Sequence, residues 1–183
     1  SALEKKLATK VEINRVDLGF FNRIVVDDFL MYDQSGKKML KAGRLSAKID
    51  LLDLLNGKIS ISSAQLFGLD AKLYKNSADE AANFQFVLDS LASKDTTSHT
   101  PLDLHIGSLV IRNSMVSYDR KDLPRTPNKL DINHLSTSRI SSHIMLYALT
   151  DDKIDLNVKH LSFAEQSGLT VNKFSMLLNA DKE

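Results

Sequence analysis

Residues 156–176, LNVKHLSFAEQSGLTVNKFSM, contain one eight-residue pattern twice. Its order is apolar, any, apolar, any, any, apolar, any, apolar, and the first copy has Leu156, Val158, Leu161 and Phe163 at the apolar positions. The second copy begins 13 residues later, at Leu169. Since residues two apart lie on one face of a β-strand, each half of the pattern predicts a strand with one apolar face.

The double spacer in the middle of the pattern would turn the second apolar pair to the opposite face of the strand. A bulge or bend at the spacer returns that pair to the first face and increases the local twist. Six more copies occur, beginning at Val11, Ile24, Leu40, Ile59, Leu104 and Leu130. The repeat therefore predicts a mainly β protein, a curved antiparallel sheet of short bent strands.

Two or three short helices are expected beside the sheet. Residues 3–10 have apolar positions four apart, and residues 51–55 contain four leucines followed by Gly57, which can close a helix. We expect these leucines to plug one end of the sheet. Residues 84–91 also have helical spacing, with Asn83 as the predicted N-cap.

The chain divides at residues 93–101, SKDTTSHTP, which contain no large apolar residue and predict a linker. Residues 1–92 form the first β-rich segment with the short helices, and residues 102–183 continue the antiparallel meander. The periodicity leaves open whether the two parts share one sheet. Turns are predicted at residues 33–36, 151–152 and 167–168, and an exposed loop at residues 119–129.

The composition is that of an ordinary folded protein. The chain has 183 residues, 43% of them hydrophobic, and a formal net charge of +1. This balance does not indicate nucleic acid as a partner. The chain contains no cysteine, which excludes disulfides and thiolate chemistry. It also contains no run of apolar residues long enough for a membrane helix. Because it starts at Ser1, we expect a longer native protein.

No catalytic, cofactor or metal site can be assembled from motifs. The five histidines are dispersed and are expected at the surface or rim of the sheet. The adjacent acidic pairs at residues 27–28 and 151–152 point to opposite faces of a strand and form no carboxylate dyad. Phe20 and Phe21 are expected to pack in the core. The sequence predicts no enzyme and no cofactor.

The apolar face has two interpretations that periodicity does not separate. A sheet whose face is covered by its own side chains needs the same alternation as a curved sheet whose concave face holds acyl chains. Packed interiors are the general rule for proteins, which favours the first interpretation.

Residues 10–75 carry a more specific signal. The short helix entering a first strand, the Tyr-Asp turn at residues 31–33, the leucine-rich turn at 51–55, and the stretches 57–63 and 66–69 resemble the N-terminal region of AsmA-like envelope proteins. The resemblance is greatest to TamB-like proteins of the Bacteroidetes type, and residues 83–91 also fit it. Residues 102–178 agree in strand rhythm only.

The resemblance implies a periplasmic module of a translocation and assembly protein, anchored to the inner membrane by a helix that precedes Leu3. Such proteins form a half-barrel groove with an apolar interior. They act in phospholipid transport to the outer membrane or in outer-membrane protein assembly, with an outer-membrane barrel protein as partner. In this chain, the barrel partner would be reached through the missing remainder. Phospholipid acyl chains would lie on the apolar positions, and the candidate groove residues are Ile24, Val26, Phe29, Ile59, Ile61, Leu66, Leu104, Ile106, Leu109 and Ile111.

Two other functions stay open from the residues alone. A β-rich interaction or structural module with a dry core would dock a protein through an exposed strand edge. An enzyme would need a convergent set of buried titratable groups that the sequence does not reveal.

Overall fold

The computed structural model describes residues 2–57, 59–92, 102–149 and 153–181. Its helices are α1 (Ala2–Leu7), α2 (Leu51–Leu55) and α3 (Gln85–Ala92). Its strands are β1 (Val11–Glu12), β2 (Arg15–Gly19), β3 (Arg23–Tyr32), β4 (Lys38–Ile49), β5 (Ile59–Lys75), β6 (Leu102–Arg120), β7 (His134–Leu149), β8 (Lys153–Glu165) and β9 (Thr170–Asp181). The linker at 93–101 and the turn at 151–152 lie outside the described residues.

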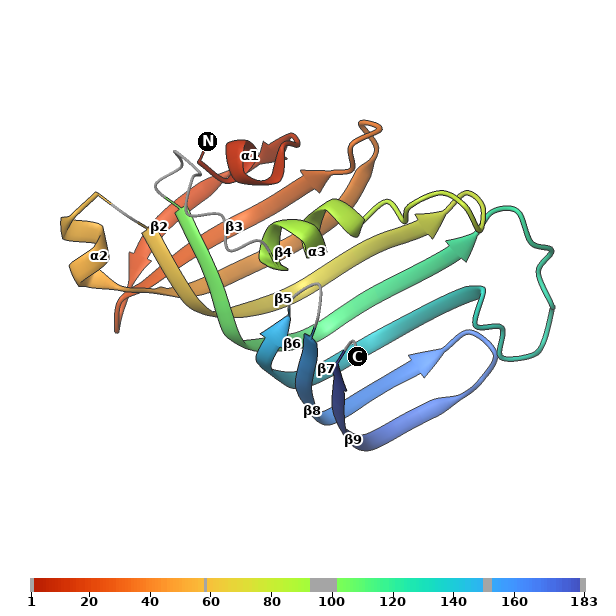
Figure 1. Cartoon of the computed structure of the whole chain (residues 1–183). Helices are drawn as coiled ribbons and strands as arrows, with labels where there is room; N and C mark the ends of the chain where they lie inside the picture. Colours follow the sequence, from red (N-terminus) through yellow and green to blue (C-terminus); the bar gives the residue numbers. More distant parts are fainter. Residues whose placement is uncertain (1, 58, 93–101, 150–152, 182–183) are drawn as a thin grey trace.

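All the strands belong to one wide sheet that does not close into a barrel (Figure 1). Its order is β1-β3-β4-β5-β6-β7-β8-β9, with β2 paired to β3 beside β1. The fold is therefore mainly β and mostly antiparallel, as the pattern predicts. Several strands are longer than one eight-residue copy, and β6 runs for 19 residues.

One strand pair departs from the antiparallel expectation. β5 and β6 run parallel, and this pair joins the two parts of the chain into a single sheet. A parallel pair needs a crossover connection, and α3 lies within it. In Figure 1, α1 and α3 lie over the same face of the sheet, and the two helices contact each other and β6.

The strands are bent, and two of the bends, at Asp28 in β3 and His160 in β8, lie at a spacer predicted from the sequence, whereas those at Gly68, Asn113 and Arg139 lie outside the predicted spacers. Each of five strands has one residue with positive φ immediately before an inward-facing residue: Asp28, Gly68, Asn113, Arg139 and His160. Asp, Asn, His and Gly tolerate this left-handed conformation better than most residues do. Register shifts accompany it in the β6–β7, β7–β8 and β8–β9 pairs. We call this line of bends across the sheet the crease.

The buried core lies where the two helices cover the sheet. Its members come from α1, β1 and β3–β5: Leu7, Val11, Val26, Phe29, Met31, Met39, Ala42, Leu69 and Ala71. Phe84, Phe86 and Val87, from α3 and the residue before it, pack against this cluster. The helices therefore fill the N-terminal part of the apolar face.

Several local expectations are confirmed at turns and wrong elsewhere. The turn at 33–36 and the turn around Gly168 are present. Asn83 does not cap α3, because its side chain accepts from the Tyr74 N–H and donates to the Lys72 carbonyl, both in β5. The strand predicted from the pattern copy that begins at Leu130 is wrong in its first half, because β7 begins only at His134.

Candidate functional site: an apolar sheet face

A continuous apolar row crosses eight strands. Each member is the register partner of the next: Leu18, Ile24, Ala47, Ala64, Leu109, Ile144, Val158 and Met176. Register partners on neighbouring strands point to the same face of a sheet. The sheet therefore has one apolar face from β2 to β9.

A second row runs beside the first and ends in a polar residue. It comprises Val16, Val26, Leu45, Leu66, Ile111 and Ser142. Ser142 is buried and donates its hydroxyl hydrogen bond to the Lys159 carbonyl at 3.1 Å. Because the Ser142 hydroxyl is hydrogen-bonded to the backbone, it needs no other polar partner on the apolar face.

The candidate groove residues divide into two groups along the sheet. Val26 and Phe29 belong to the buried core, each 7% exposed, and Ile24 and Leu66 pack against it. In contrast, four candidates are half-buried and lie outside that cluster: Ile61, Ile106, Leu109 and Ile111. The side chains of Ile59 and Leu104 lie outside the described residues.

Sequence reasoning missed the C-terminal members of the face. Ile144 and Val158 continue the first row on β7 and β8 and are half-buried, as Leu109 is. Val158 belongs to a recognised copy of the pattern, but Ile144 belongs to none. Only the strand register identifies Ile144, because the bend at Arg139 resets the alternation of β7.

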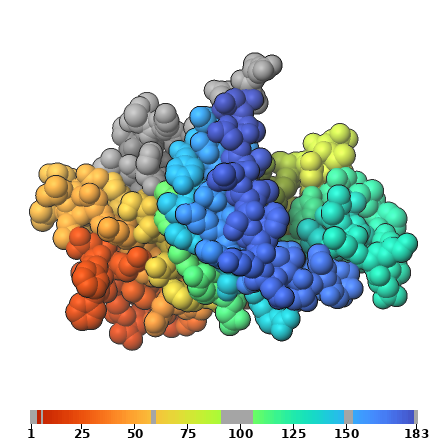
Figure 2. All heavy atoms as spheres, turned by 90° about the horizontal axis from the view of Figure 1, so that it is seen from below, coloured from red at the N-terminus to blue at the C-terminus, as the bar shows by residue number. Residues whose placement is uncertain are grey.

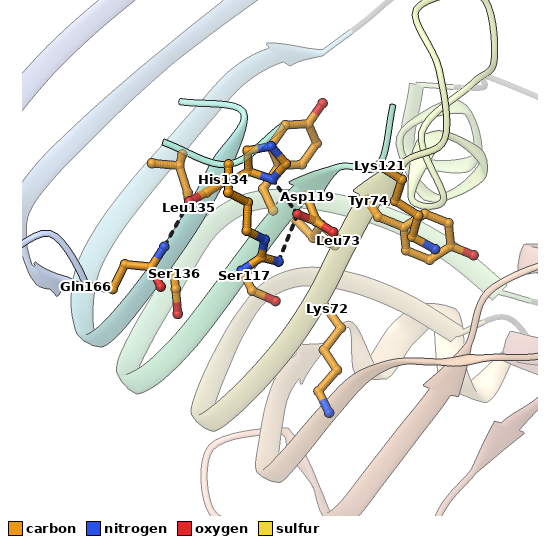
Figure 3. Close-up of a pocket in the computed structure, with 12 residues that line it drawn as sticks. Lys72, Leu73, Tyr74, Ser117, Asp119, Lys121, His134, Leu135, Ser136 and Gln166 are labelled. Atoms are coloured by element: carbon orange, nitrogen blue, oxygen red, sulfur yellow. Dashed lines mark hydrogen bonds and ion pairs between the residues drawn. The ribbon is translucent and has the colours of Figure 1, made fainter. Parts of the chain in front are cut away.

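A polar hollow of about 330 Å³ lies where β5, β6 and β7 meet the loop after β6 (Figure 3). His134, expected at the surface, is only 5% exposed, and its Nδ1 lies 2.5 Å from the Asp119 carboxylate. Arg125 from the loop donates to the same carboxylate at 3.1 Å. Lys121 stacks on the ring of Tyr74, its ammonium 3.5 Å from the ring centre.

This hollow holds the loop to the sheet. Nε2 of His134 is buried and has no hydrogen-bond partner among the described residues. A serine nucleophile would need a hydrogen bond to that nitrogen, and neither Ser117 nor Ser136, which line the hollow, makes one. Asp119 instead joins β6, β7 and the loop through its contacts with His134 and Arg125.

A second hollow, of about 580 Å³, lies at the other end of the sheet beside α2. The helix borders it with Leu51 and Leu52, and Ile61 of β5 lines it as well. The expectation that the leucines of α2 plug the sheet is wrong, because α2 contains no buried residue. Phe20 and Phe21 are also not in the core, since each is 89% exposed.

No group of acidic or histidine side chains in the described part of the chain could hold a metal ion. Within the same residues, no helix combines the length and apolarity that crossing a membrane requires. No protein-family model matches the chain, and no curated protein matches it significantly. The resemblance of residues 10–75 to AsmA-like proteins thus stays an expectation from sequence.

Proposed function

We propose that this chain is a non-catalytic periplasmic module of an AsmA- or TamB-like envelope protein, which binds phospholipid acyl chains on its apolar sheet face. It would act in phospholipid transport to the outer membrane or in outer-membrane protein assembly. The observation that carries this proposal is the apolar row from Leu18 to Met176, whose members on β6 to β9 lie outside the helix-covered core.

The acyl site would be the part of the face on β6, β7 and β8. Leu109, Ile144 and Val158 are half-buried register partners there, and none belongs to the packed core cluster. An acyl chain gains about 0.8 kcal/mol for each CH₂ that it buries. An aliphatic row without charged side chains keeps this gain nearly constant from strand to strand, so a lipid can move across the row without a large barrier.

The helix-covered part of the face has a different role in this proposal. Val26 and Phe29 are packed against α1 and α3 and stabilise the fold. The covered part thus closes one side of the sheet, and acyl chains are confined to β6, β7 and β8.

Titration of lipid-depleted protein with a fluorescent fatty acid tests the proposal. We expect saturable binding that unlabelled phospholipid displaces. A protein that takes up no probe, while circular dichroism reports an intact β fold, would contradict acyl binding by this chain.

The exposed edge of the sheet favours a second candidate, a β-rich interaction or structural module with a dry core. β9 pairs with β8 on one side only, and Leu177 in β9 is 77% exposed. An edge strand with apolar side chains can pair with a strand of another protein. Leu177→Lys would place a charge at this edge and would abolish strand pairing, but it would leave acyl-probe binding unchanged.

A further inference from the structure

The end of the sheet that carries α2 exposes an unusual set of large apolar side chains. Phe20 and Phe21 occupy the turn between β2 and β3, and Leu52 and Leu55 of α2 are 73% and 84% exposed. Figures 1 and 2 place α2 beside the β2–β3 hairpin, at the opposite end of the molecule from the loop after β6. Clustered exposed apolar groups mark binding surfaces on soluble proteins.

The turn between β2 and β3 is hydrogen-bonded to a residue just before α2, and α2 is hydrogen-bonded to β5. The Ile49 N–H, just before α2, donates to the carbonyl of Asn22 in the hairpin turn at 2.8 Å. The Asp50 N–H donates to the Ser60 carbonyl, and the Ser60 hydroxyl donates to Asp53 in α2. The apolar side chains of the turn and of α2 are therefore presented together by the rigid end of the sheet.

The backbone at this end can enter an apolar environment at low cost. The Asp50 carboxylate caps α2 by accepting from the Leu52 and Asp53 N–H groups, and Asn56 closes its other end. The hairpin is paired up to Gly19 and Arg23, on either side of its three-residue turn. Backbone groups without partners are what lipid excludes most strongly, and these hydrogen bonds satisfy backbone groups at both ends of α2 and along the hairpin as far as its turn.

Two cations next to the apolar cluster point to an anionic partner. Arg23 and Lys48 are register partners on β3 and β4, and like charges opposite each other repel. Neither forms an ion pair with an acidic side chain in the described part of the chain; Arg23 donates only to the Ser46 hydroxyl. Asp50 and Asp53 are close in sequence, but both carboxylates accept the local hydrogen bonds given above.

We propose that this end of the molecule docks onto the surface of an anionic phospholipid bilayer. Phe20, Phe21, Leu52 and Leu55 enter the boundary between headgroups and acyl chains, and Arg23 and Lys48 bind lipid phosphates. The cluster consists of a turn and a short helix that project from the sheet, a shape suited to insertion into a fluid interface. This proposal does not depend on acyl binding by the sheet face, which is measured without vesicles.

The chain has no tryptophan, so one introduced indole is an unambiguous reporter. Phe20→Trp should show a blue-shifted emission with vesicles of phosphatidylethanolamine and phosphatidylglycerol, and a smaller shift with phosphatidylcholine alone. Ile132→Trp is the matched control, because Ile132 is 72% exposed and lies in the loop at the opposite end. Its emission should not change. Equal shifts at both positions, or none at Phe20→Trp, would overturn the proposal.

Sedimentation with the same anionic vesicles separates insertion from other contacts. Leu52→Gln with Leu55→Gln, or Phe20→Ser with Phe21→Asn, should weaken vesicle binding at least about tenfold, equivalent to about 1.4 kcal/mol. Ile132→Ser should bind as the unmodified protein does. The four side chains are exposed, so the thermal midpoint should not fall. A concentration-dependent blue shift of Phe20→Trp without lipid would instead identify self-association and overturn the proposal.

Discussion

Leu66 of β5 and Ile111 of β6 lie opposite each other across the parallel pair that joins the two parts of the chain. Leu66 packs against the buried core, whereas Ile111 lies outside it. At the Leu66–Ile111 pair, the boundary between the helix-covered part and the open part of the apolar face thus runs between β5 and β6. One face has two roles, because α1 and α3 cover the N-terminal strands and the part of β6 around Val116, whereas Leu109 and Ile111 of β6 lie outside the core that the helices cover.

Phe29→Ala should destabilise the protein strongly. Phe29 is buried in the core beneath the helices, and truncating such a side chain costs about 3–5 kcal/mol. Phe174→Ala on β9 is the matched control, because Phe174 is 46% exposed and should cost about 1 kcal/mol or less. Urea unfolding of both variants measures the difference. Equal costs would contradict a filled N-terminal face.

Leu109→Asn should weaken acyl-probe binding, because it places an amide in the open part of the apolar row. The neighbouring Val110→Asn is the control. Val110 is also half-buried, but it pairs with Gln65 and His143 and therefore lies on the opposite face. We expect a loss of binding for the first variant only, measured by fluorescence titration. Equal losses in the two variants would mean that the probe does not bind this face.

Gly68→Ala tests the crease. Gly68 has a φ of +63°, which a residue with a Cβ adopts at a cost of about 1 kcal/mol. Gly43 sits opposite it on β4 with an ordinary φ, and an added Cβ there would meet only the Phe67 carbonyl oxygen at 3.7 Å. Gly43→Ala should therefore be nearly neutral in a urea titration. A Gly68→Ala variant as stable as Gly43→Ala would show that the bend is not required.

The hydrogen-bonded Asp33 carboxylate should stabilise the protein at neutral pH, and this stabilisation should be lost in acid. Burial by itself would raise the pKa of this carboxyl, but hydrogen bonds from Ser35, the Lys37 N–H and the Tyr74 hydroxyl outweigh it and lower the pKa. The unfolded carboxyl has a pKa of about 3.9. The stabilisation is therefore complete above that pH and is lost as the pH falls through the lower folded pKa.

Asp33→Ala removes these hydrogen bonds and should cost about 1–3 kcal/mol at neutral pH. The stability difference from the unmodified protein should begin to shrink below about pH 4, where the unfolded carboxyl takes up a proton, and should be lost as the native carboxyl is protonated at lower pH. Urea titrations across this pH range measure it. A difference that stays constant with pH would exclude a contribution from the charge of Asp33.

Local sequence signals predicted most of the strands, their apolar face and two of the five bends, those at Asp28 and His160. Alternation fixes which side of β3 carries Ile24 and Val26, and the double spacer indicates where the face would otherwise reverse. The spacer does not indicate which residue takes the left-handed conformation. At Asp28 and Asn113 the residue type offers a clue, whereas at Arg139 only the tertiary structure explains it.

Burial and strand order could not be predicted in the same way, because they depend on distant segments. The parallel β5–β6 pair follows from a crossover that local periodicity does not encode. His134 is buried beside Asp119, which lies 15 residues away in the sequence and also accepts a hydrogen bond from Arg125 in the loop after β6. Leu52 and Leu55 form a helix, as their spacing predicts, but no described part of the sheet covers them.

Mass spectrometry of lipids extracted from protein purified without detergent tests the central claim most directly. The open part of the apolar face should retain phospholipid in about a one-to-one ratio, and Leu109→Asn should lower that ratio while Val110→Asn does not. A folded, lipid-free monomer that also binds no added phospholipid would contradict the claim, and the face would then be a packing surface only.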